Sequence, residues 1–580
     1  MGDCEASSRK KAGIKFRIDD TLNLLMKKAY LILFVLLSLL PFSSKGQSTN
    51  APLTDEYYHL IDRYEIKQNK FAESIFTGYK AYQRKWIANF VTGQLDSLSD
   101  LTKVDQFNLQ FLANDNWEWT DAADVENTPI LKIFYQKKPD LFSVDIPEFD
   151  LHVKPVLYFQ VGKETDQEDI RYINTRGIEL RARINKKVSF YTFIAENQAR
   201  FPSYVRNRIS EQQTVPGEGF YKNFKEGGVD FFTARGYISF NATKNINIQA
   251  GQDKFFIGNG KRSMILSDFG NTYPFLKIQT QVWRFSYTNL FAELRGNFPG
   301  RNSNTRDIKK FFSLHHLSLN ITDNLNVGVF EAIISGDSTG TGFELAYLNP
   351  VIFYRAIEHY TGSNKSNAMV GADAKWNFLN RFQLYGQFVL DEFLLEHVKA
   401  RDGWWANKWA TQIGAKYIDV FGISNLDMQV EWNRARPFMY AHASSHTNYT
   451  HYDQPLAHPL GANFDEKLMI LKYQPLKRLF VEARYLQAIY GKDSLNSNFG
   501  GDIHKSYVSR TKEFDNTVGQ GVEADLKMLE LNASYMLAHR LFVDVSHTIR
   551  RYKEGTEGDK NSSITSLGVR WNIGKREHFF

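Results

Sequence analysis

The chain has 580 residues and a formal net charge of +7, but residues 1–46 hold eight basic and four acidic side chains, which leaves 63 against 60 afterwards. This near balance argues against a nucleic-acid partner. The only cysteine is Cys4, so the chain beyond residue 46 can form no disulfide, lipoprotein anchor, thiolate nucleophile or cysteine-ligated metal site.

The first predicted element is a signal peptide at residues 26–46. Lys27 and Lys28 precede the apolar run AYLILFVLLSLLP, and the small-residue sequence SSKGQ follows. This order indicates export, with cleavage after Gly46. The alternative is a membrane-anchoring helix, but the run has about a dozen apolar residues where a span needs roughly 20. Because Met26 occupies the position of a normal start, residues 1–25 are interpreted as a mis-called or disordered extension.

Residues 47–145 have a different pattern. YHLIDRYEIKQ and YQRKWIANFV place apolar side chains at helical spacing, with Leu60, Ile61 and Tyr64 on one stripe and Trp86, Phe90 and Val91 on another. We expect a small, partly helical periplasmic segment that plugs or braces the mouth of the next domain. The alternative is an ordered arm with no role beyond stability.

Residues 146–580 contain many aromatic side chains but no long run of apolar residues. The whole chain is 14% aromatic, with 29 Tyr and 45 Phe, yet its mean hydropathy is −0.41. After residue 46 no stretch of about 18 apolar residues occurs, which argues against membrane-spanning helices. A transmembrane β-barrel accounts for both facts, because its strands alternate apolar residues toward lipid with polar residues toward the lumen.

The alternation is visible in GIELRARINKKVSFYTFIAE. Ile178, Leu180, Ala182 and Ile184 fall on one face, and Glu179, Arg181 and Arg183 fall on the other. The turn Asn185-Lys186-Lys187 then reverses the chain into a second strand. We therefore predict that the apolar row faces lipid and the charged row faces the lumen.

The spacing of such segments predicts an all-β, antiparallel barrel of about 18 strands. Strands are expected to start near residues 150, 171, 188, 230, 246, 277, 290, 310, 325, 367, 382, 408, 425, 466, 479, 525, 541 and 562. Tight turns near Lys186, Lys244, Asn289, Asp323, Asn380, Gly422, Leu476 and Ala538 alternate with long segments such as 198–229, 335–366, 437–463 and 491–520. Long loops on one rim are typical of outer-membrane barrels, where they face outside. A soluble β-sandwich is the alternative, although it would not be expected to sort its loops so cleanly.

The last strand is predicted to alternate Leu567, Val569, Trp571 and Ile573 with Gly568, Arg570, Asn572 and Gly574. It is followed by Phe579-Phe580, and a terminal aromatic residue suits recognition by the barrel-insertion machinery.

Three motifs suggest chemistry but do not match what that chemistry needs. Gly336–Gly340 fits G-x-S-x-G, yet it opens a loop after a hairpin strand instead of joining a strand to a helix. Gly258–Ser263 resembles a phosphate loop, but Phe255 stands where the first glycine should be. His442, His446, His451 and His458 crowd one loop without a paired H-x-x-x-H on a predicted helix, so glycan or lipid-headgroup contact and plain solvated loop structure compete with metal binding. We predict no enzyme activity, cofactor or metal.

Several stretches resemble the Wzi-like capsule-assembly barrels and the gliding-motility outer-membrane proteins. They are FFIGNGKRSMILSDFGNTYPFLKIQTQVWRFSY, LNPVIFYRAIEHYTGSNKSNAMVGADAKWN, LYGQFVLDEF and VEWNRARPFMYAHASSHTNYTHYDQPLAHPLGANF. The resemblance covers most of residues 150–470. It implies a barrel of about 18 strands with a small helical periplasmic portion, located in the outer membrane. It also implies a non-enzymatic role in holding surface polysaccharide or adhesin and motility components at the cell surface.

The resemblance singles out a set of polar residues as candidate glycan contacts. They are Arg262, Ser263, Asp268, Arg355, Glu358, His359, Asp391, Glu392, Glu431, Arg434, Arg436, His451, Gln454 and His458. Such side chains can bind sugar hydroxyls and stack on ring faces. They can equally form a packed, paired network inside the lumen. Two functions stay open: a protein that binds or organises surface glycan, and a porin-like channel, since 18 strands leave room for water.

Overall fold

The computed structural model describes residues 48–580, except 54, 73–74, 98–100, 297–307, 337–344, 352, 355, 357–365, 495 and 556–557. The predicted signal peptide and the preceding extension therefore lie outside the described residues. No helix in the described part is long and apolar enough to cross a membrane.

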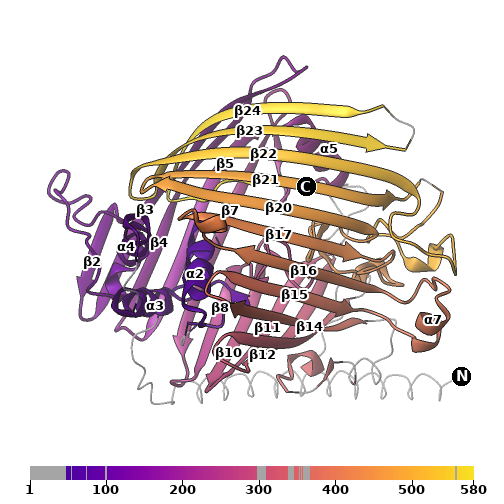
Figure 1. Cartoon of the computed structure of the whole chain (residues 1–580), viewed down its shortest axis with the longest axis horizontal. Helices are drawn as coiled ribbons and strands as arrows, with labels where there is room; N and C mark the ends of the chain where they lie inside the picture. Colours follow the sequence, from indigo (N-terminus) through magenta and orange to yellow (C-terminus); the bar gives the residue numbers. More distant parts are fainter. Residues whose placement is uncertain are drawn as a thin grey trace, which may run out of the picture. The chain divides into compact units, whose positions relative to one another are not determined.

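Eighteen antiparallel strands of the described residues close into a barrel (Figure 1). They are β3 (Phe149–Glu164), β4 (Arg171–Ile184), β5 (Val188–Arg200), β7 (Gly228–Asn241), β8 (Ile246–Asp253), β10 (Tyr273–Val282), β11 (Phe285–Arg295), β12 (Lys309–Asn320), β13 (Leu325–Gly336), β14 (Ser366–Phe378), β15 (Phe382–Leu390), β16 (Trp409–Tyr417), β17 (Leu426–Ala435), β20 (Phe464–Leu476), β21 (Leu479–Lys492), β22 (Val522–Ala538), β23 (Leu541–Glu554) and β24 (Lys560–Trp571). The predicted fold class and strand number are confirmed.

One predicted turn is wrong. The turn expected near Asn289 lies at Trp283-Arg284, where Trp283 adopts a positive φ of 52°. Asn289 is instead buried in β11 and pairs with His315 of β12. Asparagine favours turns in general, but here Asn289 pairs within the sheet and its side chain is buried.

The two faces of the strands differ as predicted. In β4, Ile178 and Ile184 point outward and are exposed, while Glu179, Arg181 and Arg183 point inward and are buried. In β24, Leu567 and Val569 are outward and Arg570 is inward. Buried charges must be paired to be tolerated, so the inward rows require partners inside the barrel.

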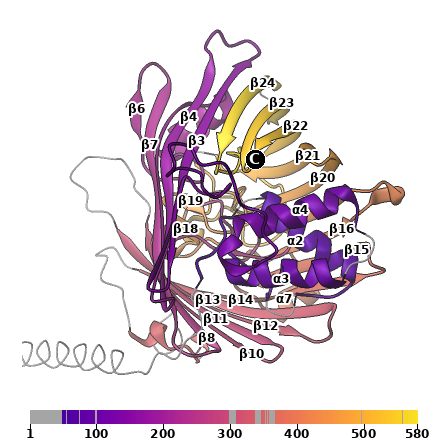
Figure 2. The same cartoon turned by 90° about the vertical axis from the view of Figure 1, so that its left-hand side faces the viewer.

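An N-terminal helical segment supplies many of those partners at the end of the barrel where the short turns lie (Figure 2). It comprises α2 (Asp55–Gln68), β1 (Tyr79–Lys80), α3 (Arg84–Ser97), α4 (Lys103–Asp115) and a 3-10 turn at Trp117–Trp119. The predicted stripes of α2 and α3 form its core, with Ile61, Tyr64 and Val91 fully buried. α4 was not predicted, although its Thr102 and Asp105 form a capping box.

Ion pairs fix α2 to the inner wall. Asp62 lies 2.6 Å from Lys416 of β16, and Glu65 lies 2.8 Å from Lys375 of β14. Arg63 contacts Asp419, in the turn after β16, at 2.6 Å. The helical segment therefore packs inside the short-turn end of the barrel.

The segment also joins the wall itself. β2 (Phe142–Ile146) pairs with the first part of β3, from Phe149 to Val153, whereas β24 pairs with β3 from Leu157 to Glu164. β2 and β24 therefore share one edge of β3, and the wall starts four residues earlier than the predicted boundary at residue 146.

At the opposite end the long connections carry the remaining elements. These are α5 (Ser203–Gln212), β6 (Lys222–Phe224), β9 (Phe256–Ile257), α7 (Leu395–Ala400), β18 (Thr450–His451), β19 (Gln454–Pro455) and several 3-10 turns. Connections 254–272 and 436–463 fold into the barrel and bury Met264, Ile265 and Tyr440 in its largest hydrophobic cluster. The described part of the barrel is therefore occupied at both ends.

Candidate functional site

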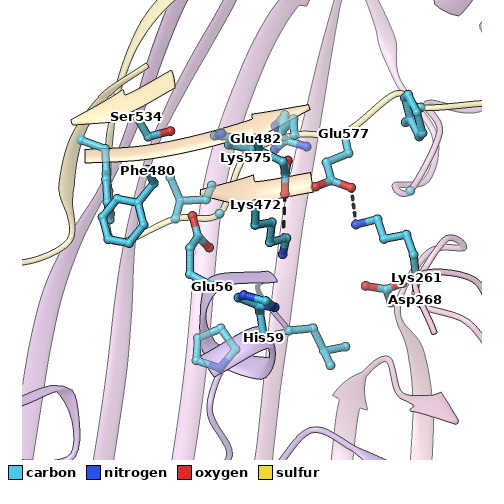
Figure 3. A pocket seen from close by; sticks show the side chains of 18 of the residues that line it. Glu56, His59, Lys261, Asp268, Lys472, Phe480, Glu482, Ser534, Lys575 and Glu577 are labelled. Carbon is cyan, nitrogen blue, oxygen red and sulfur yellow. Dashed lines mark ion pairs between the residues drawn. The ribbon is translucent and has the colours of Figure 1, made fainter. Parts of the chain in front are cut away.

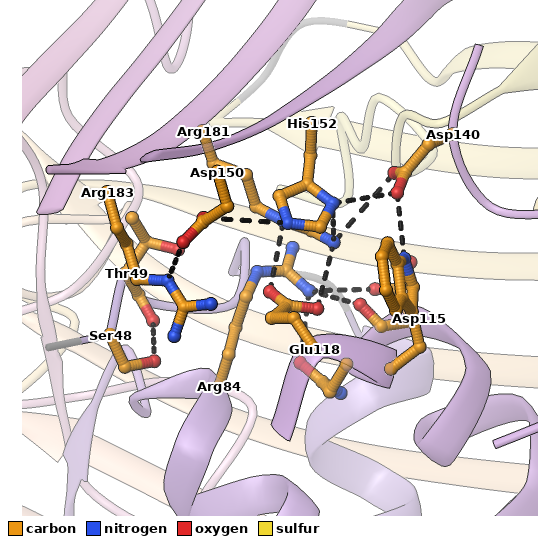
Figure 4. A network of polar contacts seen from close by, with 12 residues as sticks. Ser48, Thr49, Arg84, Asp115, Glu118, Asp140, Asp150, His152, Arg181 and Arg183 are labelled. Carbon is orange, nitrogen blue, oxygen red and sulfur yellow. Dashed lines mark hydrogen bonds and ion pairs between the residues drawn. The ribbon is translucent and has the colours of Figure 1, made fainter. Parts of the chain in front are cut away.

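The charged network between the helical segment and the wall centres on Asp115, the last residue of α4 (Figure 4). Its carboxylate is fully buried and meets cations from three directions: Arg84 at 3.1 Å, Lys154 at 2.5 Å and Arg540 at 3.3 Å. Burial alone would raise the pKa of Asp115, but the charges of these three cations outweigh it and hold the pKa well below its usual value. The carboxylate thus joins α4, β3 and the turn after β22.

A neighbouring part of this network explains the inward charges of β4. Arg181 contacts Glu118 at 3.2 Å and Asp140 at 3.8 Å, and Asp140 accepts a 2.8 Å contact from the ring of His152. Arg183 pairs with Asp150 at 2.5 Å. All are buried in the described structure, so this cluster is a packing device at the short-turn end.

Three of the predicted site residues meet in a second network deeper in the lumen. Arg262 contacts Glu466 at 3.1 Å, and His458 lies 2.8 Å from the same carboxylate. Glu431 accepts hydrogen bonds from the backbone N–H of Arg262 at 3.2 Å and from the hydroxyl of Tyr385 at 3.0 Å. The loop that carries Arg262 is thereby held against β17 and β20.

Glycines allow that close approach. Gly258 has a φ of +137°, and a Cβ there would lie 2.6 Å from Nε2 of Gln387; one at Gly260 would lie 2.8 Å from Nε2 of Gln412. The phosphate-loop resemblance of Gly258–Ser263 therefore reflects packing of a loop against the inner wall. Ser263 donates to the carbonyl of Ile257 at 2.5 Å within the same loop.

His451 and Gln454 hold the inward connections together. His451 accepts from the backbone N–H of Arg295 at 3.0 Å and lies 3.1 Å from the carbonyl of Thr272. Gln454 bonds the backbone of Gly217 at 2.8 Å and Glu218 at 2.7 Å. Both side chains are buried, so a glycan would reach them only if these connections moved.

The other predicted residues lie apart from this network. Asp391 and Glu392 contact the buried Lys408 at 3.1 and 3.2 Å. Arg434 is on the outward face of β17, 3.7 Å from Asp465. Arg436 donates to the carbonyl of Asn516 at 3.1 Å.

Glu431 takes its hydrogen bonds from the Arg262 loop, from Tyr385 of β15, from Gln412 of β16 and from its neighbours on β17. Arg355, Glu358, His359 and all but the first residue of the Gly336–Gly340 motif lie outside the described residues. Among the residues that are described, no group of three or more His, Cys, Asp or Glu side chains is placed to hold a metal ion.

The chain after β24 turns into the lumen. Arg576 pairs with Glu218 at 2.8 Å, and Glu577 pairs with Lys261 at 2.6 Å and Arg484 at 2.7 Å. The buried ring of Phe580 packs against Phe269. The predicted last strand therefore ends at Trp571, and the final aromatic pair contacts the inward loops.

A cavity of about 340 Å³ lies beside this final segment (Figure 3). Its lining runs from α2, through Lys472, Phe480 and Ser534 near the short turns, to Lys261 and Asp268. Asp268 is the one predicted site residue besides Arg262 that lines it. Aromatic side chains such as Phe480, the hydroxyl of Ser534 and the ion pair between Lys261 and Glu577 line the cavity.

A cluster of aromatic side chains that was not predicted lies at the long-loop end. We call it the aromatic platform; it is formed by His397, Trp404, Trp405, Arg510 and Phe514. Trp404 stacks on His397 at 4.5 Å, and the guanidinium of Arg510 lies 4.3 Å from the ring centre of Trp405. Phe514 is 44% exposed. Adjacent tryptophans in a long polar loop, RDGWW, are the sequence signal that could have identified it.

The buried histidines of connection 436–463 predict sensitivity to acid. Burial lowers the pKa of His451 to about 3, with smaller contributions from Lys310 and Arg295, and burial lowers that of His442 to about 4. The unfolded chain binds protons below about pH 6.5 while these folded rings do not, so stability is complete above that pH and falls toward pH 4. The protection factors of the amides in residues 436–463, which are exchange rates corrected for the intrinsic effect of pH, should fall as the pH is lowered from 7.5 to 5. His451→Gln should show a smaller fall, and an equal fall in both proteins would contradict the assignment to His451.

Comparison with known proteins agrees with this architecture. The family described as capsule assembly protein Wzi matches residues 160–565. Among solved structures, an Escherichia coli outer membrane protein, Wzi, described as a carbohydrate-binding β-barrel involved in group 1 capsule assembly, has a TM-score of 0.55 and 11% identity, covering 91% of this chain and 100% of that chain.

Two Pseudomonas aeruginosa proteins are less similar. OccK8 (OprE) has a TM-score of 0.41 and 8% identity, covering 73% of this chain and 98% of that chain. OprD has a TM-score of 0.40 and 11% identity, covering 73% and 96%. No curated protein sequence matches. Because the family match extends over more than two thirds of the chain, within the barrel traced above, the chain belongs to the Wzi capsule-assembly family.

Proposed function

We propose that this protein is an outer-membrane barrel that holds polysaccharide at the cell surface through its long-loop end and catalyses no reaction of its own. Membership of the capsule-assembly family and the fold shared with a carbohydrate-binding barrel support this proposal. The long loops then face the exterior, and the helical segment faces the periplasm.

The occupied lumen is the observation that carries the proposal. A porin needs a continuous water path, whereas here α2 is ion-paired to the wall at one end and connections 254–272 and 436–463 bury a hydrophobic cluster at the other. Those contacts favour an anchoring role over the channel alternative.

The aromatic platform offers the contacts that a sugar requires. Ring faces such as Trp404 and Phe514 stack on the apolar faces of pyranose rings, and the adjoining Arg510 and His397 can bond hydroxyls. The buried candidates, such as His451, would instead hold the loops that shape this surface.

The test replaces Trp404 and Phe514 with Ala and measures binding of capsular polysaccharide to the purified protein in vesicles. We expect about tenfold weaker binding, because each ring contact contributes about 0.5–1.5 kcal/mol. Phe421→Ala is the matched control, since Phe421 is 87% exposed in a short turn at the other end.

Two results would contradict the proposal. Unchanged binding by the folded double variant would exclude the aromatic platform as the contact surface. Steady large single-channel conductance of the unmodified protein, without glycan binding, would favour the porin.

A further inference from the structure

A hairpin before β2 exposes a group of adjacent apolar side chains. We call residues 125–138 the apolar hairpin; the backbone N–H of Lys138 bonds the carbonyl of Val125 at 2.8 Å, and Ile130 bridges to Phe134 at the tip. The tip side chains are exposed as follows: Ile130 57%, Leu131 77%, Ile133 52% and Phe134 36%. Single exposed apolar residues are common, but four in one turn indicate a contact surface.

Directly after its tip, the apolar hairpin lies against the outward face of the barrel. Tyr135 stacks on Trp571 with ring centres 5.6 Å apart and planes 8° from parallel. Trp571 ends the outward row of β24 that contains Leu567 and Val569. The hairpin therefore continues a surface that lipid covers in an outer-membrane barrel.

A backbone hydrogen bond to β3 places the hairpin beside the outward, lipid-facing surface of the barrel. The backbone N–H of Leu141, just after the hairpin, bonds the carbonyl of Val153 at 2.8 Å, well inside β3. The outward row continues beyond this point, toward the short turns, with the exposed Ile146 and Ile184. The hairpin therefore leaves the barrel at a level where exposed apolar side chains lie both toward the short turns and toward the long loops.

We propose that the apolar hairpin is an interfacial anchor whose tip inserts into the lipid leaflet at the short-turn end. Trp and Tyr rings concentrate at the headgroup level of membranes, which fits the stacked pair of Tyr135 and Trp571 beside the tip. Lys132, exposed between Leu131 and Ile133, can extend its ammonium to lipid phosphates while its neighbours enter the acyl region. This membrane contact is distinct from the glycan surface, which lies at the other end.

The chain permits a clean labelling test, because Cys4 is its only cysteine. In a Cys4→Ser background, Leu131→Cys is labelled with the environment-sensitive fluorophore NBD, and the full chain is reconstituted in phosphatidylcholine and phosphatidylglycerol vesicles. We expect blue-shifted emission, with quenching by spin-labelled lipid severalfold stronger than by aqueous iodide. Lys187→Cys is the control, because Lys187 is exposed in the short turn between β4 and β5 and should show the opposite order.

The outcomes separate three environments. Quenching by lipid supports the anchor. Quenching by iodide alone means that the tip lies in water and overturns the proposal. Protection from both quenchers means that protein covers the tip, which also overturns it. Ile133→Cys repeats the test if the first variant lacks the heat-modifiable gel migration of a folded barrel.

Discussion

Replacing Asp115 with Ala is expected to lower stability by about 3–5 kcal/mol and to detach the helical segment, because removal of one partner leaves buried charges uncompensated. Arg84 and Lys154 are both buried and contact this carboxylate at 3.1 and 2.5 Å. Denaturant unfolding followed by tryptophan fluorescence, with limited proteolysis of residues 48–145, measures both effects.

Asp115→Asn separates charge from shape and should be less damaging than Ala. Asp121→Ala is the matched control, since Asp121 is an exposed acidic residue of the same segment. Because the folded pKa of Asp115 is depressed, its stabilisation is complete above the ordinary carboxyl pKa and decreases as pH falls below that value. Equal proteolysis of the Asp115 and Asp121 variants would show that the carboxylate does not hold the helices.

Arg181→Leu is expected to impair the protein at least as much as Leu180→Arg, its neighbour on the other face. Alternation alone predicts the reverse, because a lipid-facing Arg costs up to about 2–4 kcal/mol while an open lumen tolerates polarity changes. Here Arg181 is 3% exposed and contacts the buried Glu118. Its loss leaves a buried carboxylate without its partner, at a cost of about 3–5 kcal/mol.

The two variants should fail differently. Leu180→Arg should reduce the fraction of heat-modifiable barrel in the membrane. Arg181→Leu should insert but show faster proteolysis of the helical segment. A normal protease pattern for Arg181→Leu would mean that the lumen at this level tolerates the change as an open pore does.

The barrel could be predicted because each strand and each turn follows from a pattern among adjacent residues. Period-two alternation in stretches such as residues 178–184 and the turn at Lys186 each report on adjacent residues, so the strand number follows from the sequence alone. The turn predicted near Asn289 was wrong because turn propensity is a property of single residues and does not include the pairing of β11 with β12.

The arrangement inside the barrel could not be predicted in this way. Glu466 pairs with Arg262, 204 positions away, and α2 pairs with Lys416, more than 350 positions away. Alternation shows that such residues face inward, but not which loop or helix reaches them. Of the residues that the resemblance singled out, Arg262, Glu431 and His458 hold a loop against the wall. Trp404 and Phe514 were not singled out, although the adjacent tryptophans of RDGWW mark the loop of Trp404 in the sequence.

The shared edge of β3 has a consequence for how the barrel closes. Two strands can pair in a shifted register, and the first and last strands of the barrel, β3 and β24, could pair wrongly in this way. Here β2 already occupies β3 up to Val153, and Tyr135 lies against Trp571. A shift of β24 toward the short turns would collide with these residues, so the N-terminal segment limits the register that β24 can adopt against β3.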